Sequence, residues 1–463
     1  MSRPAIRAVG AYAPSRRLPA DAIDAAWGSS PSGVESTAVP AADEDALTMG
    51  VAAAKRALDA GGVEPNALDW LGFATTTPPM AEGDLLARLA SMLGVPEDTT
   101  TRLYTGSVRA GTAALLDAPG SGLVVVADCP RGAPDDDRGH AAGAGAAAFL
   151  TGPEGVAPTT VTAHATHAEP APGVRFRRAG SETVEGLGVS TYDRSAFVDP
   201  VATACEDVRT EDADAVAITA PDGKRPYRAT GALGVESEAI RACSPVHELG
   251  DLGAASAPVA LARALAEGHE TVVCVGVGGG GADVLRVEST GTIPASLALD
   301  AGETVEYAEA LRLRGELSDE EAGTGAAYVT MPTWTRSLPQ RHRLVAGRCP
   351  DCDALAFPPE GACPDCRELV DYEAVSLAPT GTVEAATRIG QGGAPPEFAP
   401  QQARGGAFGV AVVRFEAADG AGSVSLPGQV VGEASVGDEV RGVLRRLYTQ
   451  EGVTRYGTKF ERV

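Results

Sequence analysis

The stretch LYTGSVRAGTAALLDA, residues 103–118, reads as a strand end, a tight turn of small residues and a helix that begins at that turn. The turn places Ser107 and Val108 at the N-terminus of the helix, where free N–H groups and the helix dipole stabilise negative charge. Acyl-transferring enzymes put a nucleophile at such a position. The stretch therefore predicts an acyl-transfer site, or a site of that kind that has lost its chemistry.

The segments around this stretch occur twice in the same order. In the first half a helix at 43–60 precedes a strand at 68–77, a helix at 84–94, a strand at 122–128 and a run of small residues at 143–150. In the second half a strand at 214–219 precedes helices at 227–235 and 252–268 and closing segments at 271–277 and 278–285. This order predicts a duplicated α/β unit, with halves at 1–165 and 166–335.

From about residue 340 the pattern changes to a cysteine cluster followed by short alternating runs. Cys349, Cys352, Cys363 and Cys366 have the spacing C-x2-C-x10-C-x2-C, which predicts a closed structural zinc site in a ribbon at 340–370. Two disulfides are the alternative, and they are rare in a cytosolic protein. The runs at 371–463 predict a small antiparallel barrel, with a loop at 392–408 that crosses the mouth of the barrel.

Charge is the unusual feature of the composition. The chain has 62 acidic and 38 basic residues, a net charge of −24, and only three lysines. An acidic, lysine-poor surface favours a halophilic cytoplasm, and a GC-rich genome would explain part of the bias. The N-terminus has no apolar signal-peptide core and the chain has no long apolar run, so we expect a cytoplasmic protein without membrane contact. A basic surface for nucleic acid is missing, which makes that partner unlikely.

The order of motifs resembles the thiolase superfamily, and in detail the archaeal type of 3-hydroxy-3-methylglutaryl-CoA synthase. The segments that carry the resemblance lie at 10–18, 43–58, 109–118, 143–150, 250–256 and 305–317. It implies a layered αβαβα body that forms a homodimer. The tail resembles the rubredoxin-like zinc ribbon and OB-fold proteins that associate with thiolases and act on acyl-CoA. A thiolase partner and CoA or acyl-CoA as ligand are what this second resemblance implies.

The resemblance also implies a catalytic cysteine, glutamate and histidine, and each can be placed here on its own motif. The cysteine precedes the sequence Arg-Ala-Gly-Thr at 109–112, where this chain has Val108. The glutamate belongs before the Pro-Pro pair at 78–79, where we match Thr76. The histidine belongs before Pro-Asp-Gly-Lys at 221–224, where we match Thr219. None of the three replacements can perform the original chemistry near neutral pH.

A relocated site is the alternative. Ser107, His247 and Asp251 can be drawn as a Ser–His–Asp triad, although Ser107 also suits a tight turn and His247 a polar loop. We therefore predict a non-catalytic or auxiliary subunit of a thiolase or acyltransferase complex. An active synthase with relocated residues is the second hypothesis. The third is a nucleic-acid-binding protein that uses the ribbon and barrel, which would need stacking aromatics on a basic groove.

Overall fold

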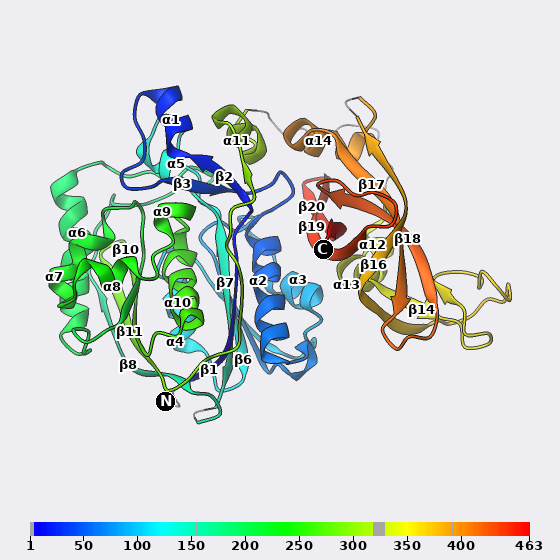
Figure 1. Cartoon of the computed structure of the whole chain (residues 1–463), viewed down its shortest axis with the longest axis horizontal. Helices are drawn as coiled ribbons and strands as arrows, with labels where there is room; N and C mark the ends of the chain where they lie inside the picture. The colour runs from blue at the N-terminus through cyan, green and yellow to red at the C-terminus, as the bar shows by residue number, and fades with distance from the viewer. Residues whose placement is uncertain (1–3, 154, 318–328, 391) are drawn as a thin grey trace. The chain divides into compact units, whose positions relative to one another are not determined.

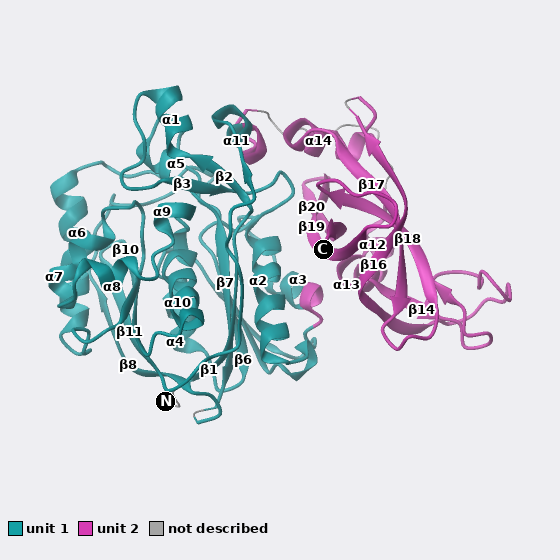
Figure 2. Cartoon of the chain, viewed as in Figure 1, with its two compact units in different colours: residues 1–90, 95–311 teal, residues 91–94, 312–463 magenta. Residues whose placement is uncertain are grey.

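The computed structural model describes residues 4–153, 155–317, 329–390 and 392–463. The chain divides into two compact units, Met1–Ala90 with Val95–Leu311, and Ser91–Gly94 with Arg312–Val463 (Figure 2). Most of the two halves expected at 1–165 and 166–335 lies in the first unit, but this unit ends at Leu311, so the end of the expected second half belongs to the second unit. In the described part of the chain, no helix combines the length and the apolar character that a membrane crossing requires.

A mixed ten-stranded sheet runs through the first unit. Its order is β5-β4-β6-β7-β1-β8-β11-β10-β9, and β12 pairs with β1. The strands are β1 (Ala5–Tyr12), β4 (Trp70–Ala74), β5 (Thr100–Tyr104), β6 (Gly122–Asp128), β7 (Gly145–Gly152), β8 (Thr159–Ala168), β9 (Ala215–Ile218), β10 (Thr271–Gly278), β11 (Gly281–Ser289) and β12 (Ala295–Ala298). A smaller sheet joins β13 (Glu303–Thr304), β2 (Arg16–Pro19) and β3 (Ser36–Val39).

The pairing pattern confirms the duplication. In the first half β4 and β6 are parallel, and β7 runs antiparallel to both β6 and β1. In the second half β9 and β10 are parallel, and β11 runs antiparallel to both β10 and β8. The sequence β4-β6-β7-β1 therefore recurs as β9-β10-β11-β8. The halves join where β1 pairs with β8, so the sheet continues from one into the other.

Helices pack on the outer faces of the two halves of the sheet. Two further helices lie between the halves and contact strands of both. Helix α2 (Ala46–Gly61) packs on β1, β6 and β7, and α6 (Ser190–Cys205) packs on β8, β10 and β11 (Figure 1). Between the half-sheets, α4 (Ala110–Asp117) packs against α10 (Ser256–Glu267). The two approach so closely that a Cβ on Gly111 would lie 2.4 Å from the carbonyl oxygen of Ala254. This is the predicted αβαβα layering.

Helix α2 shows how the sequence sets an element's ends. Asp45 accepts a hydrogen bond from the Thr48 amide, and Thr48 Oγ1 accepts one from the Asp45 amide, which forms a capping box. Gly62 closes the helix with a φ of 58°. The helix predicted at 43–60 therefore begins at Ala46, directly after its N-cap residue Asp45.

The glycine run at 278–281 forms the turn between β10 and β11. Gly279 and Gly280 have φ values of 64° and 88°, which a tight two-residue hairpin turn requires and other residues rarely adopt. The run is thus a turn that brings backbone, rather than side chains, to this end of the sheet.

The second unit contains the ribbon and a closed barrel. Helices α12 (Met331–Arg336) and α13 (Leu338–Arg343) precede ribbon strands β14 (Val345–Arg348) and β15 (Leu355–Ala356). The barrel strands are β16 (Glu373–Ile389), β17 (Phe408–Ala417), β18 (Ser423–Val431), β19 (Glu439–Gln450) and β20 (Val453–Arg462). They pair in the order β16-β17-β18-β20-β19, and β19 returns to β16. This is the five-stranded Greek-key barrel expected of an OB-fold.

The segment at 392–408, which we expected to be a loop across the barrel mouth, is partly helical. The segment contains a short turn of helix, Pro396–Phe398, and helix α14 (Ala399–Gly405). Phe398 packs against Phe408 and Tyr448, and the buried Arg404 donates to the carbonyl oxygen of Leu313 at 2.7 Å. These long-range contacts fix a segment whose proline and glycine content suggested a loop.

Candidate ligand cavity and metal centre

A cavity of about 290 Å³ lies at Val108, the position that the sequence analysis matched to a catalytic cysteine. Val108, at the head of α4, and Thr219, just after β9, both line it, together with the backbone of Gly278 and Gly279. Charged residues supply much of the remaining wall: Asp136, Asp137, Arg138, Arg175, Asp193, Asp222, Arg225 and Arg228. The structure therefore brings two of the three predicted positions into one cavity.

Val108 is packed against the hairpin turn. A Cβ on Gly278 would lie 2.3 Å from Val108 Cγ2, so only glycine fits beside this side chain. Val108 is buried and presents methyl groups where a thiolate would be needed. Thr219 is bound to β10, the strand that ends at Gly278, because its Oγ1 accepts a hydrogen bond from the Val277 amide at 3.1 Å.

Thr76 is engaged outside this cavity, by Asp128 at the end of β6. Its hydroxyl donates to Asp128 Oδ2 at 2.7 Å, and the hydroxyls of Thr75 and Thr77 donate to Oδ1. The amides of Thr76, Thr77 and Ala254 donate to the same carboxylate. Asp128 thus takes six hydrogen bonds while fully buried. The sequence analysis missed it, although an aspartate that ends an apolar strand was a visible signal.

The residues of the alternative triad are not brought together. His247 Nε2 lies 2.7 Å from the Tyr227 hydroxyl, and Nδ1 lies 2.6 Å from the carbonyl oxygen of Gly33. Asp251 Oδ2 accepts from Arg175 Nη1 at 2.6 Å, and Asp251 Oδ1 accepts from the Gly253 amide. Both ring nitrogens of His247 are occupied without Ser107 or Asp251.

Ser107 has a local role instead. Its hydroxyl accepts a hydrogen bond from the Arg109 amide at 3.2 Å, as expected for a residue that fills a tight turn. Arg109 itself reaches across to the second half, where its guanidinium binds both carboxylate oxygens of Asp283 at 2.6 and 3.2 Å. This buried ion pair fixes the start of α4, and no sequence spacing predicted it.

Cys129 is the cysteine beside Asp128, and its thiol is not activated. Burial raises the pKa of Cys129 to about 11, and the thiol lies 3.7 Å from Thr77 Oγ1. Burial likewise raises the pKa of Cys243 to about 12 and of Cys205 to about 11. A thiol that stays protonated at neutral pH is a poor nucleophile, so Cys129, Cys205 and Cys243 suit packing roles.

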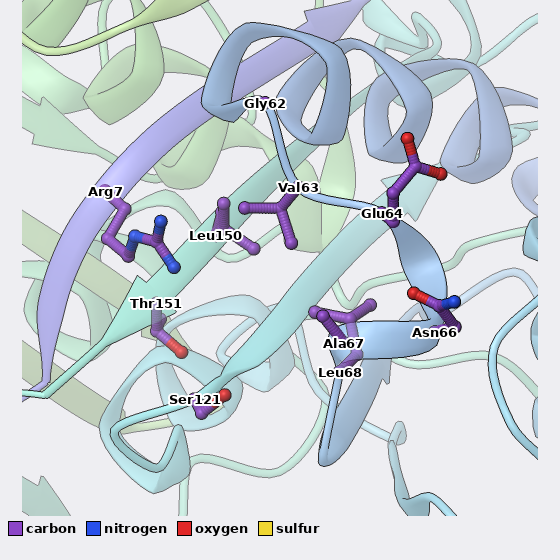
Figure 3. Close-up of a pocket in the computed structure, with 10 residues that line it drawn as sticks. All are labelled: Arg7, Gly62, Val63, Glu64, Asn66, Ala67, Leu68, Ser121, Leu150 and Thr151. Atoms are coloured by element: carbon purple, nitrogen blue, oxygen red, sulfur yellow. The ribbon is translucent and has the colours of Figure 1, made fainter.

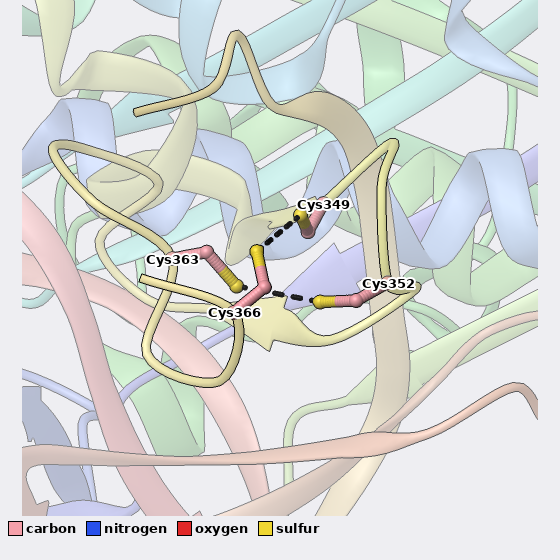
Figure 4. Close-up of side chains that lie close together, drawn as sticks. All are labelled: Cys349, Cys352, Cys363 and Cys366. Carbon is pink, nitrogen blue, oxygen red and sulfur yellow. Dashed lines mark hydrogen bonds between the residues drawn. The ribbon is translucent and has the colours of Figure 1, made fainter. Parts of the chain in front are cut away.

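The four ribbon cysteines converge on one point (Figure 4). Their sulfur atoms all lie within 4.8 Å of one another, with 3.8 Å between Cys349 and Cys366 and 3.5 Å between Cys352 and Cys363. A tetrahedron with zinc–sulfur bonds of about 2.3 Å has edges of about 3.8 Å, so the cluster fits zinc. Four thiolates fill the coordination sphere, so the metal would stabilise the fold and leave no position for substrate.

The two halves of the metal site share one backbone design. Each Cys-Pro-Asp-Cys segment is followed by a residue with positive φ, Asp353 at 62° and Arg367 at 67°. The amides of these residues donate to the carbonyl oxygens of Cys349 and Cys363, respectively. The backbone therefore turns each pair of thiols toward the metal.

A second hollow, of about 480 Å³, is lined by Arg7, Glu64, Asn66, Ser121, Leu150 and Thr151 among others (Figure 3). It is larger than the cavity at Val108, but its lining includes none of the positions singled out from the sequence. We therefore place the candidate site at Val108.

Comparison with known proteins finds relatives of both parts of the chain. Residues 336–370 match the family described as "ChsH2, rubredoxin-like zinc ribbon domain". Hydroxymethylglutaryl-CoA synthase of Thermococcus gammatolerans is 36% identical over 153 residues, which cover 31% of this chain and 44% of that protein. The synthase of Methanopyrus kandleri is 28% identical over 293 residues, 58% of this chain and 83% of that protein. The chain thus spans less than half the length of the first relative and most of the second.

Solved structures agree on the fold. MvaS in complex with 3-hydroxy-3-methylglutaryl coenzyme A has a TM-score of 0.59 at 18% identity and covers 71% of this chain and 95% of its own. 3-Oxoacyl-(acyl carrier protein) synthase III of Pseudomonas aeruginosa PAO1 has a TM-score of 0.56 at 19% identity, covering 63% and 100%. The fold is that of a thiolase-like α/β protein. More narrowly, the chain is a homologue of hydroxymethylglutaryl-CoA synthases that carries a ChsH2-type zinc ribbon and a closed five-stranded barrel.

Proposed function

We propose that this chain is an acyl-CoA-associated protein that does not perform the condensation of its relatives alone and acts as an auxiliary subunit of a thiolase or acyltransferase. The observation that carries the proposal is Val108 at the head of α4, packed against Gly278. Covalent acyl transfer needs a nucleophilic atom and a base beside it. A valine in that place supplies neither.

The surroundings of the other two positions support the same view. The Thr76 hydroxyl is committed to Asp128, and the Thr219 hydroxyl is committed to the Val277 amide. A threonine hydroxyl has no pKa near neutrality and does not replace a carboxyl or an imidazole as acid or base. In this proposal the cavity keeps a binding role and the chemistry resides in a partner.

The ribbon and barrel are the proposed means of reaching that partner. A module resembling those that accompany thiolases is fused here to a thiolase-like body, so the tail would dock on a catalytic thiolase and hold part of its CoA substrate. The body would form a homodimer. Solved relatives include a synthase complexed with CoA, which makes CoA the natural first ligand to test.

The test is a condensation assay with acetyl-CoA and acetoacetyl-CoA in molar salt, in which free CoA is measured. We expect no turnover by the purified chain and a rise in the activity of a thiolase that co-purifies with it. Cys363→Ser, which breaks the metal site, should abolish the rise, whereas Cys205→Ser should preserve it.

Turnover by the chain alone, with an acetyl adduct detected by mass spectrometry, would contradict the proposal. That result would favour an active synthase with relocated residues, and the adducted residue would identify the nucleophile.

A further inference from the structure

Asp193 is a buried carboxylate that the protein leaves unpaired. It lies in the first turn of α6, is 5% exposed and lines the cavity at Val108. Its Oδ1 has no hydrogen-bond partner, and no ion pair to it exists within the described residues. The helix N-terminus partly offsets its charge. A buried carboxylate that lacks a partner is unfavourable, so a group that binds it in the cavity would be strongly held.

The same cavity also contains unpaired donors. Arg175 uses Nη1 on Asp251, while its Nη2 is buried and has no partner in the described structure. Arg225 Nε is buried without a hydrogen bond, although it lies 3.4 Å from Asp222 Oδ2 in a poorly aligned ion pair. A ligand with a hydrogen-bond acceptor would satisfy these donors. A carboxylate is a well-suited acceptor, because its two oxygens match the geometry of a guanidinium.

The charges of the lining indicate which ligand can bind both Asp193 and the unpaired arginine donors. Arg175 pairs with Asp251, Arg225 with Asp222 and Arg138 with Asp136. The other two charged residues of the lining, Asp137 and Arg228, are exposed to solvent. Asp193 is therefore the buried charge without a counterion. A simple anion would add a second negative charge near Asp193. A hydroxyl would donate to Asp193 and leave its charge uncompensated. An ammonium group would donate a hydrogen bond to Asp193 and also compensate its negative charge.

We propose that the cavity binds a small amino acid, with its ammonium group at Asp193 and its carboxylate at Arg175. Val108, Val277 and the buried Phe197 supply the apolar wall for a short aliphatic side chain. A cavity of about 290 Å³ holds about ten times the volume of a liquid water molecule, which is enough for such a ligand. This site goes beyond the auxiliary role and does not rest on it, because it needs no thiolase partner.

The test is calorimetric titration of the full chain in molar salt with glycine, L-alanine, L-valine and L-leucine. We expect saturable binding of at least one. For the best of them, the 2-hydroxy acid and the amine of the same carbon skeleton should bind at least ten-fold more weakly, because each lacks one of the two charged groups. No saturable binding of any of the four, or equal binding of the hydroxy acid, would overturn the proposal.

Two substitutions test whether the amino acid binds in this cavity. Asp193→Asn keeps the shape of the side chain and removes its charge, so it should weaken amino-acid binding at least ten-fold. Asp199→Asn changes an exposed residue on the same helix and should leave binding unchanged. A thermal melt of each variant checks that it is folded. Unchanged binding by a folded Asp193→Asn protein would also overturn the proposal.

Discussion

Thr76 and Asp128 are joined by a hydrogen bond of 2.7 Å between Oγ1 and Oδ2, inside a cage of six donors that contains no cation. The negative charge of Asp128 is therefore held by neutral hydroxyl and amide dipoles. The cage links the loop after β4 to the end of β6 and to the turn before α10.

Asp128→Ala should destabilise the protein markedly, because it leaves several buried donors unsatisfied. We expect a loss of about 3 kcal/mol or more in the free energy of unfolding. Asp128→Asn, which keeps one acceptor oxygen, should lose less. Denaturant titration of the full chain measures both, and Asp137→Ala, at an exposed position, is the matched control. A loss of less than about 1 kcal/mol for Asp128→Ala would show that the cage contributes little.

Val108→Cys should restore a nucleophile without restoring condensation. A thiol at the N-terminus of α4 is favoured as thiolate, so we expect an acetyl adduct at residue 108 after incubation with acetyl-CoA. The acid/base groups remain threonines at 76 and 219, so no condensation product should form. Intact-mass and free-CoA measurements report the two steps. An adduct on Ser107→Cys but not on Val108→Cys would mean that the catalytic position is shifted by one residue.

Cys129 should resist alkylation in the folded protein. Because burial raises its pKa to about 11, the neutral thiol is favoured and the reactive thiolate is scarce at pH 8. The rate of iodoacetamide labelling should rise about ten-fold per pH unit between pH 8 and 10. Peptide mass spectrometry follows Cys129, with the denatured chain as the control. Rapid labelling at pH 8 would make Cys129 a candidate nucleophile after all.

Removal of the metal should unfold the ribbon. We expect one zinc per chain by elemental analysis, its release by a strong chelator, and loss of the ribbon's amide protection in hydrogen exchange, since structural zinc sites contribute folding energy directly. Cys352→Ser should reproduce the loss, and Cys274→Ser should not remove the metal. A fully protected ribbon after complete zinc removal would contradict a structural role.

Salt should stabilise the chain. With a net charge of −24, self-repulsion falls as the screening length shrinks from about 10 Å at 0.1 M salt to about 3 Å at 1 M. We expect the melting temperature to rise over this range in potassium chloride, and further in saturating salt. A flat or falling melting temperature would remove the halophilic interpretation of the composition.

Local chemistry made much of this structure predictable. The Cys-x2-Cys pairs determined the metal centre, because four thiols at that spacing have few other uses. The repeated order of segments revealed the duplication, and the strand at 122–128 was placed at its observed ends. The cap of α2 and the glycine turn at 279–280 also follow from neighbouring residues.

The contents of the site were less predictable, because they depend on residues far apart in the chain. Arg175 reaches Asp251 across 76 positions, and Arg109 reaches Asp283 across 174. Neither partner can be chosen from spacing. The His247 ring was placed near Asp251 because the two are close in sequence, but it turns to Tyr227 and to the backbone of Gly33.

The places of Thr76, Thr219 and Val108 in the fold have a consequence if the proposed loss of catalysis is correct. Thr76 lies beyond the end of β4, Thr219 directly follows β9, and Val108 lies in the turn between β5 and α4. The continuous sheet that joins the two halves does not depend on the catalytic identity of these residues. Natural selection for a folded body and natural selection for catalysis therefore act on different residues. Under the proposed function, substitutions at these three positions would remove the catalysis and leave the fold available for another use.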